Sequence, residues 1–112
     1  MKKEYICPIE ISTEIIGGKW KPWILWYLRE KPKRHSELKK EVSNISARIL
    51  TQQLRELEEK KIVNRKVYAQ VPPKVEYSLT ELGKELEPVL LSMVQWGKRY
   101  QKEFNLKCLN EN

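Results

Sequence analysis

Apolar residues in the first third of the chain follow the spacing of two short helices. In the first, over about residues 8–17, isoleucines form one apolar side, Pro8 suits the opening turn, and the pair Gly17-Gly18 ends the helix. The second covers about residues 20–29, with Pro22 in its first turn, where a missing N–H costs nothing. Its shared apolar face consists of Trp20, Ile24, Tyr27 and Leu28.

The next pattern predicts a short helix, a tight turn and a longer amphipathic helix, which together form a helix-turn-helix over about residues 36–60. Ser36 is a suitable N-cap for the short helix, and Ser46 is one for the longer helix, which reaches about Lys60. The longer helix has a buried stripe at i, i+4 and i+7: Leu50, Leu54 and Leu57. At about 100° per residue, its opposite face carries Arg48, Gln52, Arg55 and Glu59, with Thr51 on its flank.

A period of two follows directly and predicts a β-hairpin. Residues 62–69 are rich in β-branched side chains, Pro72-Pro73 stiffens the connection, and residues 75–79 return as a second strand. A hairpin over about residues 62–79, placed immediately after a helix-turn-helix, is a wing.

The last segment predicts a helix over about residues 81–104, capped by Thr80. Pro88 lies inside this pattern, so we expect a kink or break near Glu85. The helix has an apolar stripe at heptad-like spacing: Leu82, Leu86, Val89, Leu90, Met93, Trp96 or Gly97, Tyr100 and Phe104. One small core cannot cover so long a stripe, so we expect the first and last helices to form a dimer interface.

The predicted fold class is mainly α with a small β-hairpin: a winged helix-turn-helix that dimerises through its amino- and carboxy-terminal helices. The 112 residues, 40% hydrophobic and 33% charged, suit a single domain over residues 1–112. Lysine and arginine number 22 against 15 acidic residues, which gives a net charge of +7. A small domain this basic often meets a polyanion, either nucleic acid or an anionic membrane surface, although a merely soluble cationic surface is the alternative.

Features that the sequence lacks exclude several classes of protein. The longest apolar run, from Trp23 to Leu28, is far shorter than the roughly 20 residues that span a bilayer, and acidic residues interrupt any secretory signal near the amino terminus. We therefore expect a cytoplasmic protein. Cys7, Cys108 and the lone His35 are too few for the usual four zinc ligands, so the sequence predicts no metal and no cofactor.

The sequence also argues against an enzyme. Gly17-Gly18-Lys19 is similar to the end of a phosphate-binding loop, but Thr13 stands where the first glycine belongs and Trp20 where Ser or Thr belongs. A single histidine leaves little scope for a catalytic triad. We expect no catalytic activity, and we interpret His35 as a polar surface residue.

Basic and polar residues of both helices of the predicted helix-turn-helix and of the wing are candidate contacts with duplex DNA. A glutamine such as Gln52 can bond to adenine, and Thr51 can meet a thymine methyl group. The arginines fit phosphate or guanine, and Lys33 and Arg34 add charge at another edge. A solvated surface is the alternative for each lysine. The candidates are Ser36, Lys39, Ser46, Arg48, Thr51, Gln52, Arg55, Arg65, Lys66 and Lys74.

Three tryptophans, Trp20, Trp23 and Trp26, crowd one short helix and cannot all face one way. Aromatic residues fill cores and interfaces more often than they stack on bases. We interpret some of them as dimer interface, or as the lining of a ligand pocket between the second helix and the terminal one.

Several motifs occur in a fixed order over about residues 7–100. They are Cys7-Pro8-Ile9, Gly17-Gly18-Lys19-Trp20, Ser36-Glu37-Leu38, residues 45–58, residues 71–83 and Trp96-Gly97. In this order and spacing the chain closely resembles the HxlR-type family of bacterial winged-helix transcriptional regulators. One position departs, because the family commonly has Arg-Phe before Ser-Glu-Leu and this chain has Arg34-His35. The resemblance implies a sequence-specific repressor or activator that binds an inverted-repeat operator as a homodimer.

The resemblance also implies that some members sense electrophiles or oxidants through the cysteine that Cys7 matches. At the start of a helix, the dipole and the free N–H groups favour the thiolate. The other interpretation of Cys7 is a small apolar residue packed in the dimer interface. Cys108 is a candidate disulfide partner across the dimer, and the sequence specifies no small-molecule effector. The alternative function is a winged helix that docks onto protein without specific DNA binding, because a fold does not fix function.

Overall fold

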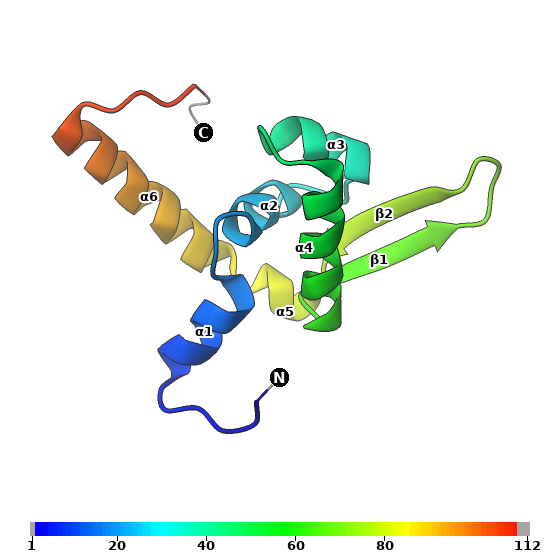
Figure 1. Cartoon of the computed structure of the whole chain (residues 1–112), viewed down its shortest axis with the longest axis horizontal. Helices are drawn as coiled ribbons and strands as arrows, with labels where there is room; N and C mark the ends of the chain where they lie inside the picture. Colours follow the sequence, from blue (N-terminus) through cyan, green and yellow to red (C-terminus); the bar gives the residue numbers. More distant parts are fainter. Residues whose placement is uncertain (1, 110–112) are drawn as a thin grey trace.

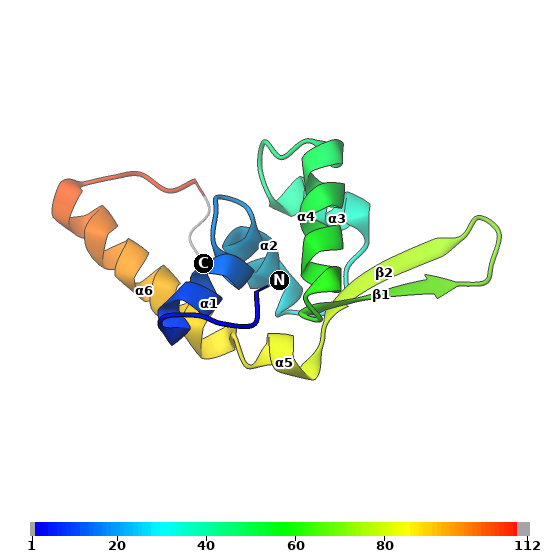
Figure 2. The ribbon, with the colours of Figure 1, turned by 60° about the horizontal axis from the view of Figure 1, so that its bottom comes forward.

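The computed structural model describes residues 2–109 and has the winged helix-turn-helix architecture that the sequence predicts (Figure 1). Both views show the β-hairpin projecting from one side of the helical body and the last helix from the opposite side (Figures 1 and 2). In chain order the elements are α1 (Pro8–Ile16), α2 (Lys21–Leu28), α3 (His35–Glu41), α4 (Ala47–Glu59), β1 (Val63–Tyr68), β2 (Lys74–Leu79), α5 (Glu81–Lys84) and α6 (Glu87–Phe104).

The core lies between α2, α3, α4 and the base of the hairpin. Its fully buried side chains are Ile24, Leu25, Leu38, Val42, Leu50, Leu54, Leu57, Val63 and Leu90. Helix α1 has no buried residue, and only Ile15 and Ile16 pack against the core from outside. The amino-terminal helix and most of α6 are therefore peripheral to the core.

The two helix-turn-helix elements begin with different caps. Ser46 caps α4, because the Ile49 backbone N–H donates to its hydroxyl oxygen at 3.1 Å, as the sequence predicts. The prediction that Ser36 caps the preceding helix was wrong. Helix α3 begins at His35, and the Arg34 backbone N–H donates to the Glu37 carboxylate at 2.8 Å. A glutamate three residues after the N-cap makes this bond in a capping box, so the helix starts before Ser36.

The hairpin is antiparallel, and its register pairs Val63 with Leu79 at the base and Tyr68 with Lys74 near the tip. Lys33 adds a short bridge to the outer side of β2. Its backbone N–H donates to the Tyr77 carbonyl oxygen at 2.9 Å, and its own carbonyl oxygen accepts from the Tyr77 N–H at 2.8 Å.

This bridge buries the Lys33 side chain, which is 3% exposed, and corrects the expectation that Lys33 adds surface charge. Its ammonium donates to Glu30 and to Glu41, each at 2.6 Å. Burial by itself would lower the pKa of Lys33, but the bonds to both carboxylates raise it above its usual value. The same hydrogen bond has the opposite effect on its acceptor, because it lowers the pKa of Glu30. Lys33 thus stabilises the junction between α2, α3 and the wing.

The terminal segment breaks where the sequence predicts, between α5 and α6. The Thr80 hydroxyl caps α5 by accepting from the Gly83 N–H at 2.9 Å, and it donates to the Lys61 carbonyl at 2.8 Å. A Cβ at Gly83 would overlap the carbonyl oxygen of Ile62, so the glycine permits this close approach. Across residues 2–109, no helix combines the length and apolar content that crossing a membrane requires.

Candidate nucleic-acid interface

Helix α4 separates an apolar face from a polar one. Its leucine stripe, Leu50, Leu54 and Leu57, is completely buried in the core, as the spacing predicts. The opposite side is exposed and, with Ala47, lines a shallow hollow. We call this surface the polar face of α4, and it consists of Arg48, Thr51, Gln52 and Arg55.

Residues with left-handed backbone stand at both ends of α4. Asn44, in the turn before the helix, has φ 68°, and Lys61, just after it, has φ 64°. Asparagine tolerates this region better than most residues, whereas lysine is strained there. Between Asn44 and the cap, the buried side chain of Ile45 fixes the turn to the core.

A buried lysine fixes α4 to α2. Lys21 is 8% exposed, and its Nζ lies 3.0 Å from Oε1 of Gln53 and 2.7 Å from Oε1 of Glu56. Both partners lie on α4. This polar contact adds direction to the packing of the leucine stripe.

A second polar contact reaches α4 from α3. His35 Nε2 lies 3.0 Å from the Thr51 hydroxyl oxygen and 3.3 Å from the Ala47 carbonyl oxygen. The sequence predicted only a polar surface histidine and missed this contact. The two α3 candidates, Ser36 and Lys39, are exposed and make no such bond to α4 among the described residues.

The wing candidates divide between its two faces. Directly paired residues of antiparallel strands share a face, so the register puts Lys66 with Glu76 and Tyr68 with Lys74 on one side. Arg65 pairs with the core-facing Tyr77 and lies on the other side, although it is itself exposed. The hairpin therefore brings Lys66 and Lys74 together and does not bring Arg65 to them.

Tyr68 organises the lysine side of the wing. Lys66 and Lys74 lie over its ring, with Nζ at 4.7 Å and 4.8 Å from the ring centre. Its hydroxyl donates to Glu76 at 2.9 Å, and Lys74 lies 3.4 Å from the same carboxylate. The hydrogen bond from Tyr68, followed by the nearby Lys74, lowers the pKa of Glu76. Glu76 therefore offsets part of the Lys74 charge, while Lys66 has no acidic partner among the described residues.

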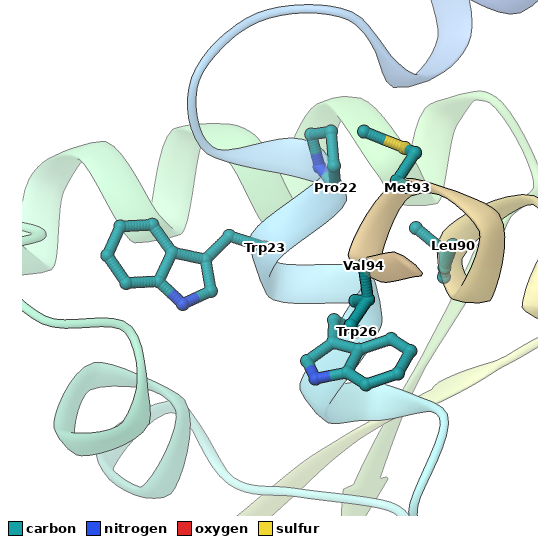
Figure 3. Close-up of a pocket in the computed structure, with 6 residues that line it drawn as sticks. All are labelled: Pro22, Trp23, Trp26, Leu90, Met93 and Val94. Atoms are coloured by element: carbon teal, nitrogen blue, oxygen red, sulfur yellow. The ribbon is translucent and has the colours of Figure 1, made fainter. Parts of the chain in front are cut away.

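Tryptophans of α2 line an open apolar cavity of about 210 Å³ between α2 and α6 (Figure 3). Its walls are Pro22, Trp23, Trp26, Leu90, Met93 and Val94. Trp23 stacks on Trp20 with ring centres 5.8 Å apart, and the Arg29 guanidinium lies 3.6 Å from the centre of the Trp26 ring. Of the tryptophans, Trp23 and Trp26 thus line the cavity between α2 and α6.

Much of α6 is apolar and exposed. Trp96 is 66% exposed and Phe104 is 60% exposed, and Tyr100 lies between them with ring centres 5.4 Å and 4.6 Å away. Ile9 of α1 is also exposed. We call the exposed side chains Val89, Met93, Trp96, Tyr100 and Phe104 the apolar stripe of α6. Only Leu90 of this helix is buried in the core.

Both cysteines are exposed free thiols. Cys7 occupies the N-cap position of α1, as expected from the proline that follows it. Cys108 lies beyond the end of α6.

Comparisons with known proteins agree with this geometry. The chain matches the family model described as HxlR-like helix-turn-helix over residues 15–105. It is 52% identical over 101 residues to the uncharacterized HTH-type transcriptional regulator YkvN of Bacillus subtilis (strain 168), a match that covers 90% of this chain and 86% of YkvN.

Two solved structures have the same fold. The redox regulator HypR in its oxidized form is 50% identical, with a TM-score of 0.80 over 83% of this chain and 96% of HypR. The reduced form of the transcriptional regulator YodB from B. subtilis is 35% identical, with a TM-score of 0.74 over 86% of this chain and 95% of YodB.

Proposed function

The chain belongs to the HxlR-like helix-turn-helix family of transcriptional regulators, and from this premise we propose that it binds an inverted-repeat operator in the cytoplasm as a homodimer. The observation that supports DNA docking is the separation of α4 into a buried apolar face and an exposed polar face. Because its leucines are wholly buried, Arg48, Thr51, Gln52 and Arg55 are presented together on the outside. A helix of this kind reads base edges in the major groove.

The roles of the individual contacts follow from their chemistry. Gln52 and Thr51 read bases, while the arginines on either side contact phosphate or guanine. Ser46 lies at the amino-terminal end of α4, where helix N–H groups meet phosphate. Ser36 and Lys39 of α3, and Arg65, Lys66 and Lys74 of the wing, add backbone contacts on the two sides.

Substitutions on α4 and on the wing test this assignment. Gln52→Ala should cost about 1–3 kcal/mol on the correct operator only, because a bidentate base contact is lost. Lys66→Ala and Lys74→Ala should weaken all duplexes alike and lower the salt slope by about one unit each. Equal losses of Gln52→Ala on specific and scrambled duplexes would show that α4 does not read sequence through this residue. A salt series with the wild type decides against protein docking, since only a DNA complex weakens steeply as salt rises.

The apolar stripe of α6 supports the homodimer. Together with Ile9 and Ile11 of α1, it leaves more exposed apolar surface than a small soluble monomer usually carries. Pairing with a second copy about a two-fold axis covers this surface and sets two α4 helices roughly 34 Å apart, which is one turn of DNA.

Mass in solution at micromolar concentration tests the dimer. Trp96→Glu should yield monomers, because a charge in the interface lacks a partner. Gln95→Glu is the matched control, since it adds the same residue next door, on a side of α6 away from the stripe, and should remain dimeric. A wild-type monomer that binds a half-site normally would contradict the dimer.

A response to electrophiles or oxidants through Cys7 completes the proposal. HypR is described as a redox regulator, and Cys7 of this chain is an exposed thiol at the start of a helix. Two thiols, either Cys7 from each copy or Cys7 and Cys108, can join as a disulfide when an oxidant such as diamide takes up their two protons and two electrons. Diamide should then change operator binding of the wild type but not of Cys7→Ser, and Cys108→Ser reports the partner. Unchanged binding in the wild type would leave Cys7 as a packing residue.

A further inference from the structure

His35 makes a contact that the DNA-docking proposal leaves unused. It is the first residue of α3, yet its Nε2 lies 3.0 Å from the Thr51 hydroxyl oxygen and 3.3 Å from the Ala47 carbonyl oxygen. The Thr51 hydroxyl oxygen also lies 2.9 Å from the same carbonyl. These three groups form a closed cluster at the polar face of α4, because Ala47 and Thr51 both line its hollow.

The carbonyl oxygen determines the direction of these bonds. It can only accept, so the Thr51 hydroxyl donates its hydrogen to Ala47 and keeps only acceptor capacity. Nε2 must then carry a hydrogen that points to the Thr51 oxygen. Without that hydrogen, the nitrogen lone pair would face the lone pairs of the Ala47 carbonyl. His35 therefore donates through Nε2–H.

This arrangement decides what Thr51 offers to a ligand. A helical threonine usually divides between two rotamers, because its hydroxyl can bond to a carbonyl of the preceding turn in either one. The bond from His35 favours the rotamer observed here, and in it the Thr51 hydroxyl oxygen accepts a second hydrogen bond. With its hydrogen donated to Ala47, the hydroxyl has no donor left for a base. The methyl group of Thr51 is free for apolar contact and matches the C5-methyl group of thymine in the major groove.

We propose that His35 is a positioning residue for base recognition, which holds Thr51 with its hydroxyl engaged and its methyl group free to contact a thymine. The inference rests on the proposed docking of α4 in the major groove. It assigns a specificity role to a residue of α3 that need not touch the DNA itself.

Duplexes that differ by a single methyl group test this proposal. The probe is a duplex that the wild type selects from random sequences, with each thymine of one half-site replaced in turn by deoxyuridine. At one position this loss of a methyl group should weaken wild-type binding about fourfold, which is the contribution of one buried methyl-sized group. Thr51→Val keeps a methyl group and should keep this discrimination, whereas Thr51→Ser should abolish it.

The His35 variants separate positioning from a merely structural role. In His35→Ala the ratio between thymine and deoxyuridine duplexes should fall below about twofold, because a freely rotating Thr51 buries its methyl less of the time. His35→Gln keeps a side-chain N–H donor at similar reach and should restore the ratio. A structural role would weaken all duplexes by one factor and leave the ratio unchanged.

Three results overturn the inference. They are an unchanged ratio in His35→Ala, loss of discrimination in Thr51→Val, and a selected duplex that is insensitive to deoxyuridine at every thymine. In each of these cases the wild type still binds its selected duplex, so DNA docking stands. If the wild type selects no duplex at all, the docking proposal fails and this inference fails with it.

Discussion

Helices α4 and α6 are both amphipathic, but the chain buries the apolar side of only one of them. The leucine stripe of α4 is entirely buried by α2, α3 and the hairpin, and its polar side faces solvent. Helix α6 buries Leu90 alone and leaves an apolar stripe exposed along most of its length. Two views show the two helices on different parts of the molecule, with α4 beside the wing and α6 extending away from it (Figures 1 and 2).

The difference indicates that the two helices have different roles. A helix whose apolar side is satisfied internally can present a rigid polar surface, which suits a site that must hold side chains in fixed positions. A helix whose apolar side is unsatisfied lowers its free energy by finding another apolar surface. The helix-turn-helix and the wing thus bury their apolar residues within one copy, whereas in the proposed homodimer the terminal helices would depend on a second copy.

Removing one leucine from each helix gives the largest expected effect. Leu54→Ala should lower the free energy of unfolding by about 2–5 kcal/mol, because it leaves a cavity at a completely buried position. Leu91→Ala, on α6 at a position 45% exposed, should cost less than about 1 kcal/mol.

Urea unfolding at several protein concentrations measures both changes, since the stability of the proposed dimer would depend on concentration. The Leu54→Ala loss should appear at every concentration. Equal losses in the two variants would mean that α6 is as much a part of the core as α4, and the comparison would fail.

Local rules of sequence explain why α4 and the break before α6 were predictable in detail. The spacing of Leu50, Leu54 and Leu57, the cap at Ser46 and the break caused by Pro88 each depend on residues within one or two helical turns. These rules involve local backbone geometry, burial and a short-range capping hydrogen bond. The helix-turn-helix and the wing therefore follow from the sequence without knowledge of their partners.

Residues whose roles depend on distant partners were not predictable in the same way. Lys33 is buried because Tyr77, far along the chain, pairs with its backbone, and His35 reaches Thr51 on the next helix. Ser36 is not the N-cap that the sequence predicts, because the neighbouring glutamate accepts a hydrogen bond from the Arg34 N–H and the helix begins one residue earlier. Basic residues look alike in a sequence, whereas tertiary contacts divide them into buried anchors such as Lys33 and exposed candidates such as Lys66.

Removing the Lys33 charge has the next largest expected effect on the stability of the helix-turn-helix and the wing. Lys33→Met should lower the free energy of unfolding by about 2 kcal/mol, because two carboxylates lose the ammonium between them. Both carboxylates remain partly exposed and can recover water, which limits the loss. Lys31→Met removes the same charge from an exposed neighbouring position and should have almost no effect. Matching losses in the two variants would mean that the buried contact adds nothing.

The same contact predicts a smaller effect of pH. Because Lys33 lowers the pKa of Glu30 from its ordinary value of 4.5, the folded state gains stability above that value. This contribution should disappear as the pH falls through the lowered pKa, since the folded carboxylate then takes up its proton. Unfolding measured from pH 6 to about pH 3 should show a weaker acid-side decline in Lys33→Met than in the wild type. An identical decline in both proteins would contradict the assigned cause.

The ends of the two helices give the smallest expected effect. Both α4 and α6 finish at a left-handed residue, Lys61 with φ 64° and Asn105 with φ 55°. Lys61→Gly should raise the free energy of unfolding by about 0.5 kcal/mol, because glycine has no Cβ to clash there, although its greater freedom in the unfolded chain offsets part of the gain. Lys60→Gly is the matched control: it removes the same charge at φ −84°, where glycine only loses entropy, and should lower stability by a similar amount.

Asn105→Gly should change little, because asparagine already tolerates the conformation and this end of α6 lies outside the core. Urea midpoints at one protein concentration compare the three variants. Stabilisation by Asn105→Gly equal to that by Lys61→Gly would show that the two helix ends are held equally firmly, against the contrast between α4 and α6.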